Sequence, residues 1–141
     1  MIRYRTDLDG IRPTHLSGFF DGWPNRPSPE THLRILEGSD HVVLAIDDQA
    51  ERVVGFATAI TDGVLAAYIP LLEVLPRYRG RGIGGELMRT LLNSLEGYYM
   101  IDLVTDQALG AFYAPLGFGP AHAMAMRRRD MQSGRPDDTA D

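Results

Sequence analysis

A run of glycines and arginines past the middle of the chain carries the clearest chemical signal in the sequence. It reads Arg77-Tyr78-Arg79-Gly80-Arg81-Gly82-Ile83-Gly84-Gly85 and stands between an apolar stretch and an amphipathic one. At a helix start, several backbone N–H groups are unpaired and the macrodipole is positive, which attracts phosphate. Glycines let the backbone approach such a ligand, and arginines can add charge-assisted hydrogen bonds. The run therefore predicts a pyrophosphate-binding loop at the mouth of a helix.

Two other interpretations of this run stay open. A tight turn could need glycine for its dihedral angles alone. Gly80, Gly82 and Gly85 also fit G-x-G-x-x-G, with Asp102 about 20 residues on, a pattern typical of dinucleotide-binding folds. Against that pattern, only one helix and one strand are expected after Asp102, which is too few for a doubly wound sheet. A Walker A loop is excluded, because the sequence contains no lysine.

Two acidic residues are candidates for a general base. Glu73 lies in a run of leucines and valines, and Asp102 lies between two aliphatic residues. A carboxylate in apolar surroundings needs a partner or a raised pKa, which is a property of many catalytic acids and bases. A salt bridge to Arg77 or Arg79 would explain each acid equally well. If their strands are neighbours, the two acids could share one cleft.

Other catalytic chemistries find no support in the sequence. There is no cysteine, so a thiol nucleophile, a disulfide framework and a thiolate zinc site are excluded. The four histidines lack metal-ligand spacing, and no serine stands in a G-x-S-x-G elbow. We expect no metal cofactor.

Hydrophobic periodicity and turn residues predict a mixed α/β domain. Two short helices should come first, the second beginning with the serine cap and proline of Ser28-Pro29-Glu30. An antiparallel hairpin and an irregular strand containing Pro70 should follow, and then a right-handed strand-helix-strand crossover. The expected helices span 11–20, 28–38, 83–96 and 108–116, and the expected strands span 41–46, 52–60, 64–75, 98–104 and 118–126.

Composition limits the domain number, the partners and the compartment. A chain of 141 residues suits a single domain, here 1–129, and the polar, acidic stretch 130–141 is predicted to be disordered. The formal net charge of -5 argues against nucleic-acid binding. The first residues carry charges in place of an apolar leader, and no stretch approaches the roughly 20 apolar residues of a membrane span. We therefore expect a cytoplasmic protein without a membrane partner.

Two motifs resemble those of the GNAT N-acetyltransferases. Arg79-Gly80-Arg81-Gly82-Ile83-Gly84 is similar to the family pattern Gln/Arg-x-x-Gly-x-Gly/Ala. Phe112-Tyr113-Ala114-Pro115-Leu116-Gly117-Phe118 is similar to its aromatic-Tyr-x-x-x-Gly-Phe. The resemblance implies a central, mostly antiparallel sheet with one parallel, splayed strand pair and flanking helices.

The resemblance also implies acetyl-coenzyme A as co-substrate and roles for particular residues. Tyr113 would be the general acid, and Glu73 or Asp102 the base. Main-chain groups near Leu72 and Val74 would hold pantetheine, and the pyrophosphate would lie on Arg79, Gly80, Arg81, Gly82, Ile83, Gly84 and Gly85.

The acceptor implied by the resemblance is a small-molecule or peptide amine, and the protein would be a monomer or a homodimer. A non-catalytic coenzyme A-binding module is the alternative function. Asp106 and Leu109 depart from the family pattern, which has asparagine and a small alanine there.

Overall fold

The computed structural model describes residues 1–137, and its centre is a five-stranded sheet in the order β1-β2-β3-β4-β5. The first four strands are antiparallel to their neighbours, whereas β4 and β5 run parallel. The strands are β1 (Ile2–Arg5), β2 (His41–Asp47), β3 (Arg52–Thr61), β4 (Ala66–Val74) and β5 (Met100–Asp102). This mixed sheet confirms the predicted fold class. It also removes the dinucleotide-binding alternative, because a doubly wound fold has a mostly parallel sheet.

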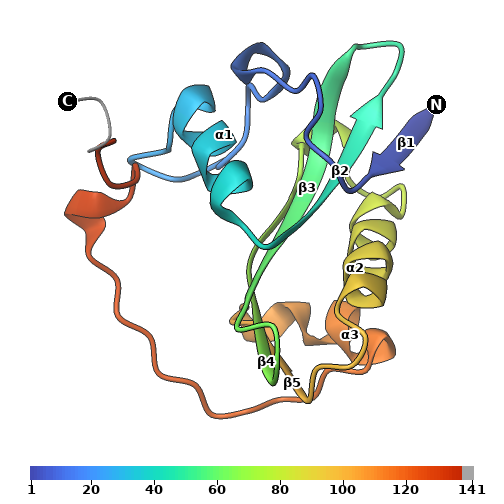
Figure 1. Ribbon diagram of the computed structural model, residues 1–141, viewed down its shortest axis with the longest axis vertical. Helices are drawn as coiled ribbons and strands as arrows, with labels where there is room; N and C mark the ends of the chain where they lie inside the picture. The colour runs from blue at the N-terminus through green and yellow to red at the C-terminus, as the bar shows by residue number, and fades with distance from the viewer. Residues whose placement is uncertain (138–141) are drawn as a thin grey trace.

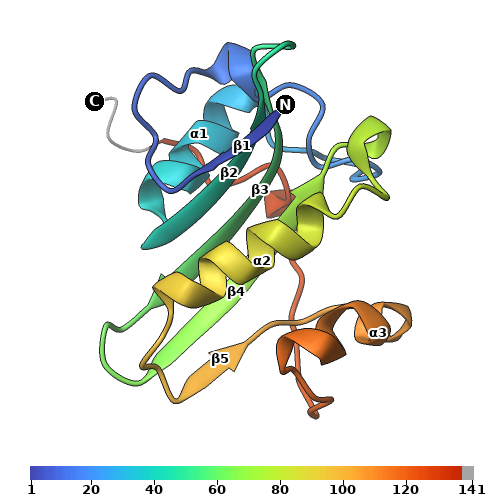
Figure 2. The same cartoon turned by 90° about the vertical axis from the view of Figure 1, so that its right-hand side faces the viewer.

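Helices cover both faces of the sheet. The helix α1 (Pro29–Gly38) lies on one face, and α2 (Ile83–Ser94) lies on the other (Figures 1 and 2). The short helix α3 (Gly110–Tyr113) lies on the same side as α2, next to β5 (Figure 2). The 3-10 turns span Pro13–His15, Pro76–Tyr78, Gln107–Leu109, Ala114–Leu116 and Arg129–Met131.

Local signals account for the two longer helices. The Ser28 hydroxyl accepts the Thr31 backbone N–H at 3.1 Å, which caps α1, and Pro29 occupies its first turn. In α2 the residues repeated at three- and four-residue spacing are those that the sheet buries. They are Ile83, Leu87, Met88 and Leu91.

The core on the α1 side contains a histidine among aromatic rings. The His32 ring lies 4.4 Å from that of Phe56 and about equally close to Phe19 and Phe20, at 5.2 and 5.0 Å. It is 1% exposed, and burial lowers its pKa from 6.5 to about 4. Neither ring nitrogen has a hydrogen-bond partner within the described residues. His32 is therefore held neutral as a packing residue.

Three predicted elements differ from the structure, and one strand of the structure was not predicted. The helix expected over 11–20 is only the 3-10 turn Pro13–His15. The strand β1, absent from the prediction, is an edge strand that contains two arginines. Charged residues are common on edge strands, and they weaken the hydrophobic pattern by which a strand is predicted. The strand expected over 98–104 shortens to Met100–Asp102, and residues 118–126 form no strand and pair with no other segment of 1–137.

The chain after α3 leaves the sheet and returns to the α1 side (Figure 1). There the Asn25 backbone N–H donates to the Gln132 side chain at 2.9 Å, and Arg34 donates to the Arg135 carbonyl at 3.0 Å. The tail predicted from residue 130 begins within this anchored stretch, and residues 138–141 lie outside the described residues. Along 1–137, no helix has the length and apolar character needed to cross a membrane.

Candidate active site

The glycine-rich loop connects β4 to α2. After Val74 the chain makes the 3-10 turn Pro76–Tyr78, and α2 begins at Ile83. Gly80 and Gly82 have φ angles of 79° and 81°. This left-handed region costs a residue with a side chain roughly 1–2 kcal/mol. The turn itself therefore requires glycine at these two positions.

The start of α2 presents unpaired backbone donors. Gly82 has no side chain to cap the helix, and the first helical hydrogen bond runs from the Glu86 N–H to the Gly82 carbonyl at 3.1 Å. Between residues 1 and 137, no protein acceptor binds the backbone N–H groups of residues 80 to 85. These groups lie at the positive end of the α2 macrodipole. The loop can therefore hold an anion such as a phosphate through its backbone alone.

The arginine side chains of the loop stabilise its shape. Arg79 donates through Nε to the Val74 carbonyl at 2.9 Å, and its Nη2 lies 3.7 Å from the Asp21 carboxylate. Arg81 donates to the Arg77 carbonyl at 3.2 Å and stacks over the Tyr78 ring at 5.0 Å. Both guanidinium groups thus have partners within the loop and its surroundings.

A gap opens between β4 and β5. Their parallel pairing covers Ala66↔Met100, Ala67↔Ile101 and Tyr68↔Asp102, and it ends there although β4 continues to Val74. The register of β4 against β3 also shifts just after Tyr68, beside Pro70. Proline cannot donate to a ladder, so Pro70 favours this break. From 69 to 74, which includes Leu72 and Val74, β4 therefore has no strand beside it on the β5 side within residues 1–137, although Arg79 occupies the Val74 carbonyl.

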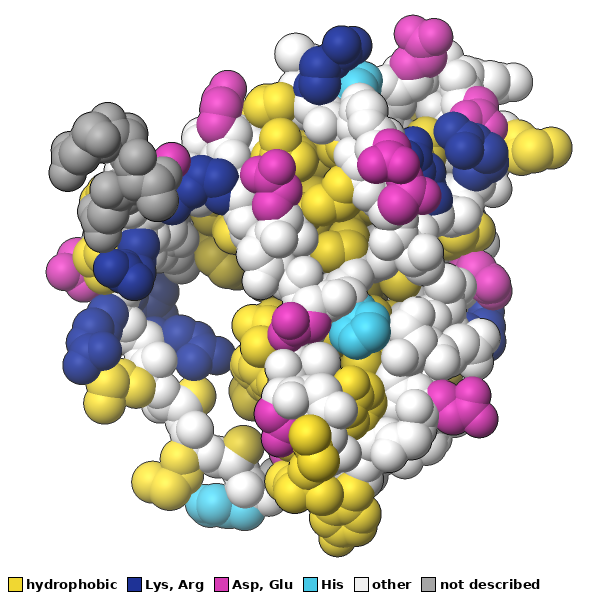
Figure 3. Space-filling view, in the orientation of Figure 1, with side chains coloured by type: hydrophobic (Ala, Val, Ile, Leu, Met, Phe, Trp, Pro, Cys, Tyr) yellow, Lys and Arg dark blue, Asp and Glu magenta, His cyan; other side chains and the backbone are white. Residues whose placement is uncertain are grey.

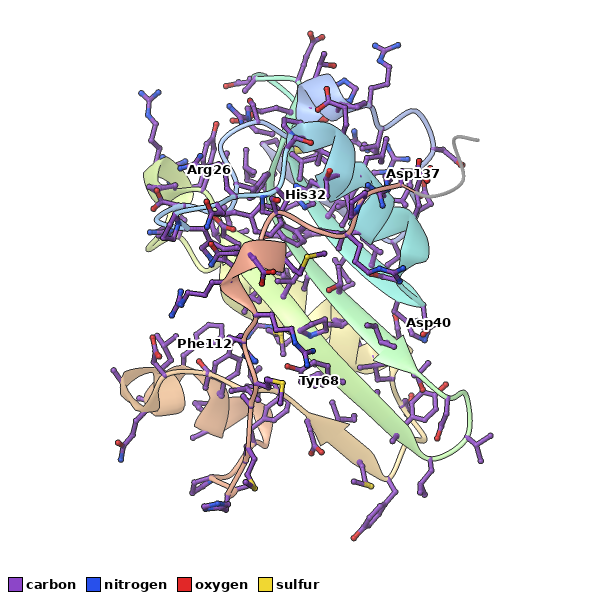
Figure 4. The ribbon with its side chains drawn as sticks, turned by 90° about the vertical axis from the view of Figure 1, so that its left-hand side faces the viewer. Arg26, His32, Asp40, Tyr68, Phe112 and Asp137 are labelled. Carbon is purple, nitrogen blue, oxygen red and sulfur yellow. The ribbon has the colours of Figure 1, made fainter. Side chains whose placement is uncertain are left out.

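Three elements meet beside this gap. A Cβ added to Gly84, in the first turn of α2, would lie 3.5 Å from the Phe112 ring and 3.9 Å from Cγ2 of Val74. Figure 4 shows Phe112 reaching from α3 towards β4. Gly84 therefore lets α3 approach the end of β4 and the anion-binding turn.

Tyr113 follows Phe112 and lies on the same short helix. Its ring contacts those of Phe112 and Phe118 at 4.8 and 5.9 Å, and Thr105, which follows β5, is a polar neighbour of its hydroxyl. Burial raises the pKa of Tyr113 above its usual value of 10.0, and the nearby Thr105 side chain only partly offsets this effect. The phenol is therefore protonated at neutral pH, as a proton donor must be.

Glu73 is bound by a distant loop. Its two carboxylate oxygens accept the backbone N–H groups of Phe20 at 2.8 Å and of Asp21 at 3.1 Å. Phe20 has a φ angle of 61°, an unfavourable conformation for a residue with a side chain. Neither Arg77 nor Arg79 forms an ion pair with Glu73 in residues 1–137. The carboxylate thus holds the segment that leads to Trp23, whose ring lies 4.9 Å from that of Phe20.

Asp102 lies far from Glu73, contrary to the expectation of a shared cleft. Asp102 is exposed and is paired with Tyr68, five residues before Glu73 on β4. At the usual rise of a strand this offset corresponds to about 16 Å. The predicted strands are neighbours, but the parallel register separates the two acids.

Sequence reasoning missed the backbone of Phe20 and Asp21 and the hydroxyl of Thr105. These groups come from segments without a motif, and only tertiary contacts bring them to Glu73 and Tyr113. No cluster of three or more potential metal ligands occurs among the described residues.

Comparison with known proteins identifies the family and the fold. The sequence model described as the Acetyltransferase (GNAT) family matches residues 8–118, which include the anion-binding turn, the open edge of β4 and Tyr113. This chain belongs to the GNAT family. Its sheet with the parallel β4–β5 pair is the GNAT fold.

Relatives of this GNAT protein occur among curated proteins and solved structures. GCN5-related N-acetyltransferase 1, chloroplastic, from Arabidopsis thaliana is 30% identical over 81% of this chain, which spans 59% of that relative. The chain thus covers less than two thirds of the curated protein. A crystal structure assigned as an acetyltransferase from Deinococcus radiodurans R1 is 48% identical, with a TM-score of 0.93 over 96% of this chain and 94% of that one.

A more distant structure shares the GNAT fold. AAC(6')-Iy, in complex with the bisubstrate analogue CoA-S-monomethyl-acetylneamine, is 18% identical and has a TM-score of 0.58 over 91% of this chain and 97% of its own. At this identity the likeness is one of fold.

Proposed function

We propose that this GNAT enzyme takes acetyl-coenzyme A as donor and transfers the acetyl group to an amine by direct attack within a ternary complex. One observation carries the proposal: the unpaired N–H groups of residues 80–85 follow directly on the open edge of β4. A pyrophosphate on these groups would leave the pantetheine arm beside Leu72 and Val74. The coenzyme A moiety of the analogue bound by AAC(6')-Iy supports this donor.

The proposed reaction forms a carbon–nitrogen bond and breaks the carbon–sulfur bond of the thioester. Free main-chain groups near Val74 stabilise the oxyanion that forms on the carbonyl, and one such donor can contribute roughly 3 kcal/mol. Tyr113 gives its phenolic proton to the departing thiolate, because α3 holds it beside the gap. With no cysteine and no serine elbow in the sequence, no acyl-enzyme is required.

The attacking amine must lose a proton, and Glu73 and Asp102 remain the candidate acceptors. Glu73 lies on the part of β4 that has no β5 strand beside it. Asp102 pairs with Tyr68, near the start of β4. Two Glu73 lone pairs are used by backbone N–H groups, and a carboxylate has about four. Glu73 is the better candidate, and it would accept the proton through a water molecule.

The acceptor is proposed to be a small-molecule or peptide amine. The acidic balance of the chain, with a formal net charge of -5, favours a cationic substrate. The proposal also includes a cytoplasmic location and no nucleic-acid or membrane partner.

Thermal shift and thiol release test the proposal together. Acetyl-coenzyme A at 100 times its dissociation constant should stabilise the fold by about 2.7 kcal/mol, and NAD should not. Thiol release should then follow with at least one member of a panel of small amines and peptides. Absence of a shift would contradict the donor site. A shift without thiol release from any amine would contradict amine transfer.

A further inference from the structure

Residues 17–23, here called the Trp23 loop, lie before α1 and reach the glycine-rich turn that precedes α2 (Figure 2). Three of its residues, Gly18, Phe20 and Gly22, have left-handed φ angles of 90°, 61° and 81°. A residue with a side chain adopts this region only where its surroundings hold it there. The contacts of Phe20 and its neighbours therefore set the shape of the loop.

The Trp23 loop is attached to β4 at Glu73. The backbone N–H groups of Phe20 and Asp21 each donate to one oxygen of this carboxylate, at 2.8 and 3.1 Å. The N–H of Trp23 in turn donates to the Phe20 carbonyl at 3.1 Å, and the two rings lie 4.9 Å apart. Trp23 is 37% exposed. The attachment at Glu73 therefore places a partly exposed indole close to the candidate base.

The Asp21 side chain attaches the same loop to the glycine-rich turn. Its carboxylate lies 3.7 Å from Nη2 of Arg79. Acidic and basic side chains are interspersed over the upper part of the molecule (Figure 3), and an exposed pair such as Arg3–Asp48 contributes little by itself. Asp21 differs from these residues because its backbone binds Glu73 while its side chain faces Arg79. One residue thus connects the turn, β4 and the Trp23 loop.

Arg79 has a second contact, at the gap beside β4. Its Nε donates to the Val74 carbonyl at 2.9 Å. The N–H of the same peptide group, that of Leu75, donates to Val54 on β3 at 2.8 Å. In a trans peptide group the carbonyl and the N–H point in opposite directions, so the Val74 carbonyl points away from β3 and into the gap. Arg79 therefore occupies a carbonyl at the place proposed for the pantetheine arm.

We propose, building on the proposed function, that Asp21 is a positioning residue that couples donor binding to the Trp23 loop. A bound donor takes the Val74 carbonyl from Arg79. The freed guanidinium then moves onto the Asp21 carboxylate, because a charged acceptor forms a stronger hydrogen bond than a neutral carbonyl. This second attachment of Asp21 closes the Trp23 loop over Glu73. Occupation of the donor site thus prepares the acceptor side.

Trp23 provides a direct test, because it is the only tryptophan in the sequence. Its fluorescence, excited beyond the absorption of tyrosine and adenine, should become less sensitive to acrylamide quenching as acetyl-coenzyme A is added. This change should saturate at the dissociation constant that calorimetry measures. Asp21→Asn should still bind acetyl-coenzyme A, weakened by about fivefold, the lower end of usual coupling between sites. It should lose most of the Trp23 response, and Asp21→Glu should restore it.

Asp48→Asn is the matched control, because it removes an exposed ion pair outside the Trp23 loop. It should keep the full response. Asp21→Asn retains the backbone N–H that binds Glu73, so the two asparagine variants should unfold at the same temperature without ligand.

The outcomes separate the coupling from the donor site itself. If calorimetry detects no binding of acetyl-coenzyme A to the unaltered protein, the proposed donor site is wrong. If acetyl-coenzyme A binds and Trp23 does not respond, or if Asp21→Asn responds as fully as Asp48→Asn, the donor site stands and the coupling is wrong. If Asp21→Asn abolishes binding, Asp21 belongs to the donor site and its role as a positioning residue is refuted.

Discussion

The carboxylate of Glu73 accepts the backbone N–H of Phe20 at 2.8 Å, although 53 positions separate the two residues in the chain. The neighbouring N–H of Asp21 occupies its second oxygen. An acid that the sequence presents as a candidate base therefore also fastens the loop leading to Trp23. Its substitution separates these two roles.

Glu73→Gln should destabilise the protein. The single amide oxygen of glutamine can still accept one of the two backbone N–H groups. The amide NH2 then faces the other N–H group, and two donors cannot form a hydrogen bond. The loss should be about 1–3 kcal/mol in the free energy of unfolding, the usual range for a hydrogen bond to a charged group. Chemical denaturation measures it, and Glu37→Gln on exposed α1 should change little. If Glu73 is the general base, Glu73→Gln should also remove the acidic limb of the pH–rate profile. A purely structural role would keep that limb and raise KM for the amine.

Gly82→Ala should impair acetyl-coenzyme A binding beyond its effect on stability. Gly82 and Gly97 both have left-handed φ angles, 81° and 101°, with open space where a Cβ would lie. Alanine at either position should cost roughly 1–2 kcal/mol of stability. Only Gly82 stands among the unpaired N–H groups, so calorimetry should detect weaker binding for Gly82→Ala alone. If Gly82→Ala and Gly97→Ala bound acetyl-coenzyme A with equal affinity, the glycine turn would not be part of the donor site.

Tyr113→Phe should lower kcat by about 100-fold, within the range typical of a general acid, and leave acetyl-coenzyme A affinity unchanged. The exposed Tyr99→Phe serves as the control. Because burial raises the pKa of Tyr113, its proton is retained at every pH below the usual 10.0. The unaltered enzyme should therefore show no loss of kcat from this group between pH 7 and 9. Full turnover by Tyr113→Phe would refute the assignment.

His32 should make the protein sensitive to acid. Burial lowers its pKa from 6.5 to about 4, so the folded state favours the neutral ring. This contribution is complete above pH 6.5 and is lost as the pH falls towards 4. At pH 4.5 the loss should be about 2–3 kcal/mol relative to pH 7.5. His32→Leu should lack this component in denaturation experiments at the two pH values, whereas exposed His122→Leu should retain it.

The anion-binding turn and the longer helices could be predicted because their causes are local. Gly80 and Gly82 are needed by their own φ angles, and Ser28 caps the N–H three residues later. The apolar repeat of α2 likewise depends only on helical periodicity. Each of these signals stands within one or two turns of the element that it specifies.

Elements that depend on a partner were misjudged. The strand β1 forms because it pairs with β2, whereas residues 118–126 have strand-like composition but no pairing partner among the described residues. A strand is stabilised by its neighbours, so composition alone indicates only a tendency.

The sequence by itself determined the mixed α/β class, the family and the position of the glycine turn, because these follow from short motifs and periodicity. Tertiary structure alone decided that β4 and β5 part after Tyr68, that Glu73 holds Phe20, and that Asp102 lies away from Glu73. The physical reason is register: a shift of a strand by a few residues moves a carboxylate by many ångströms, and packing over the whole chain sets that shift.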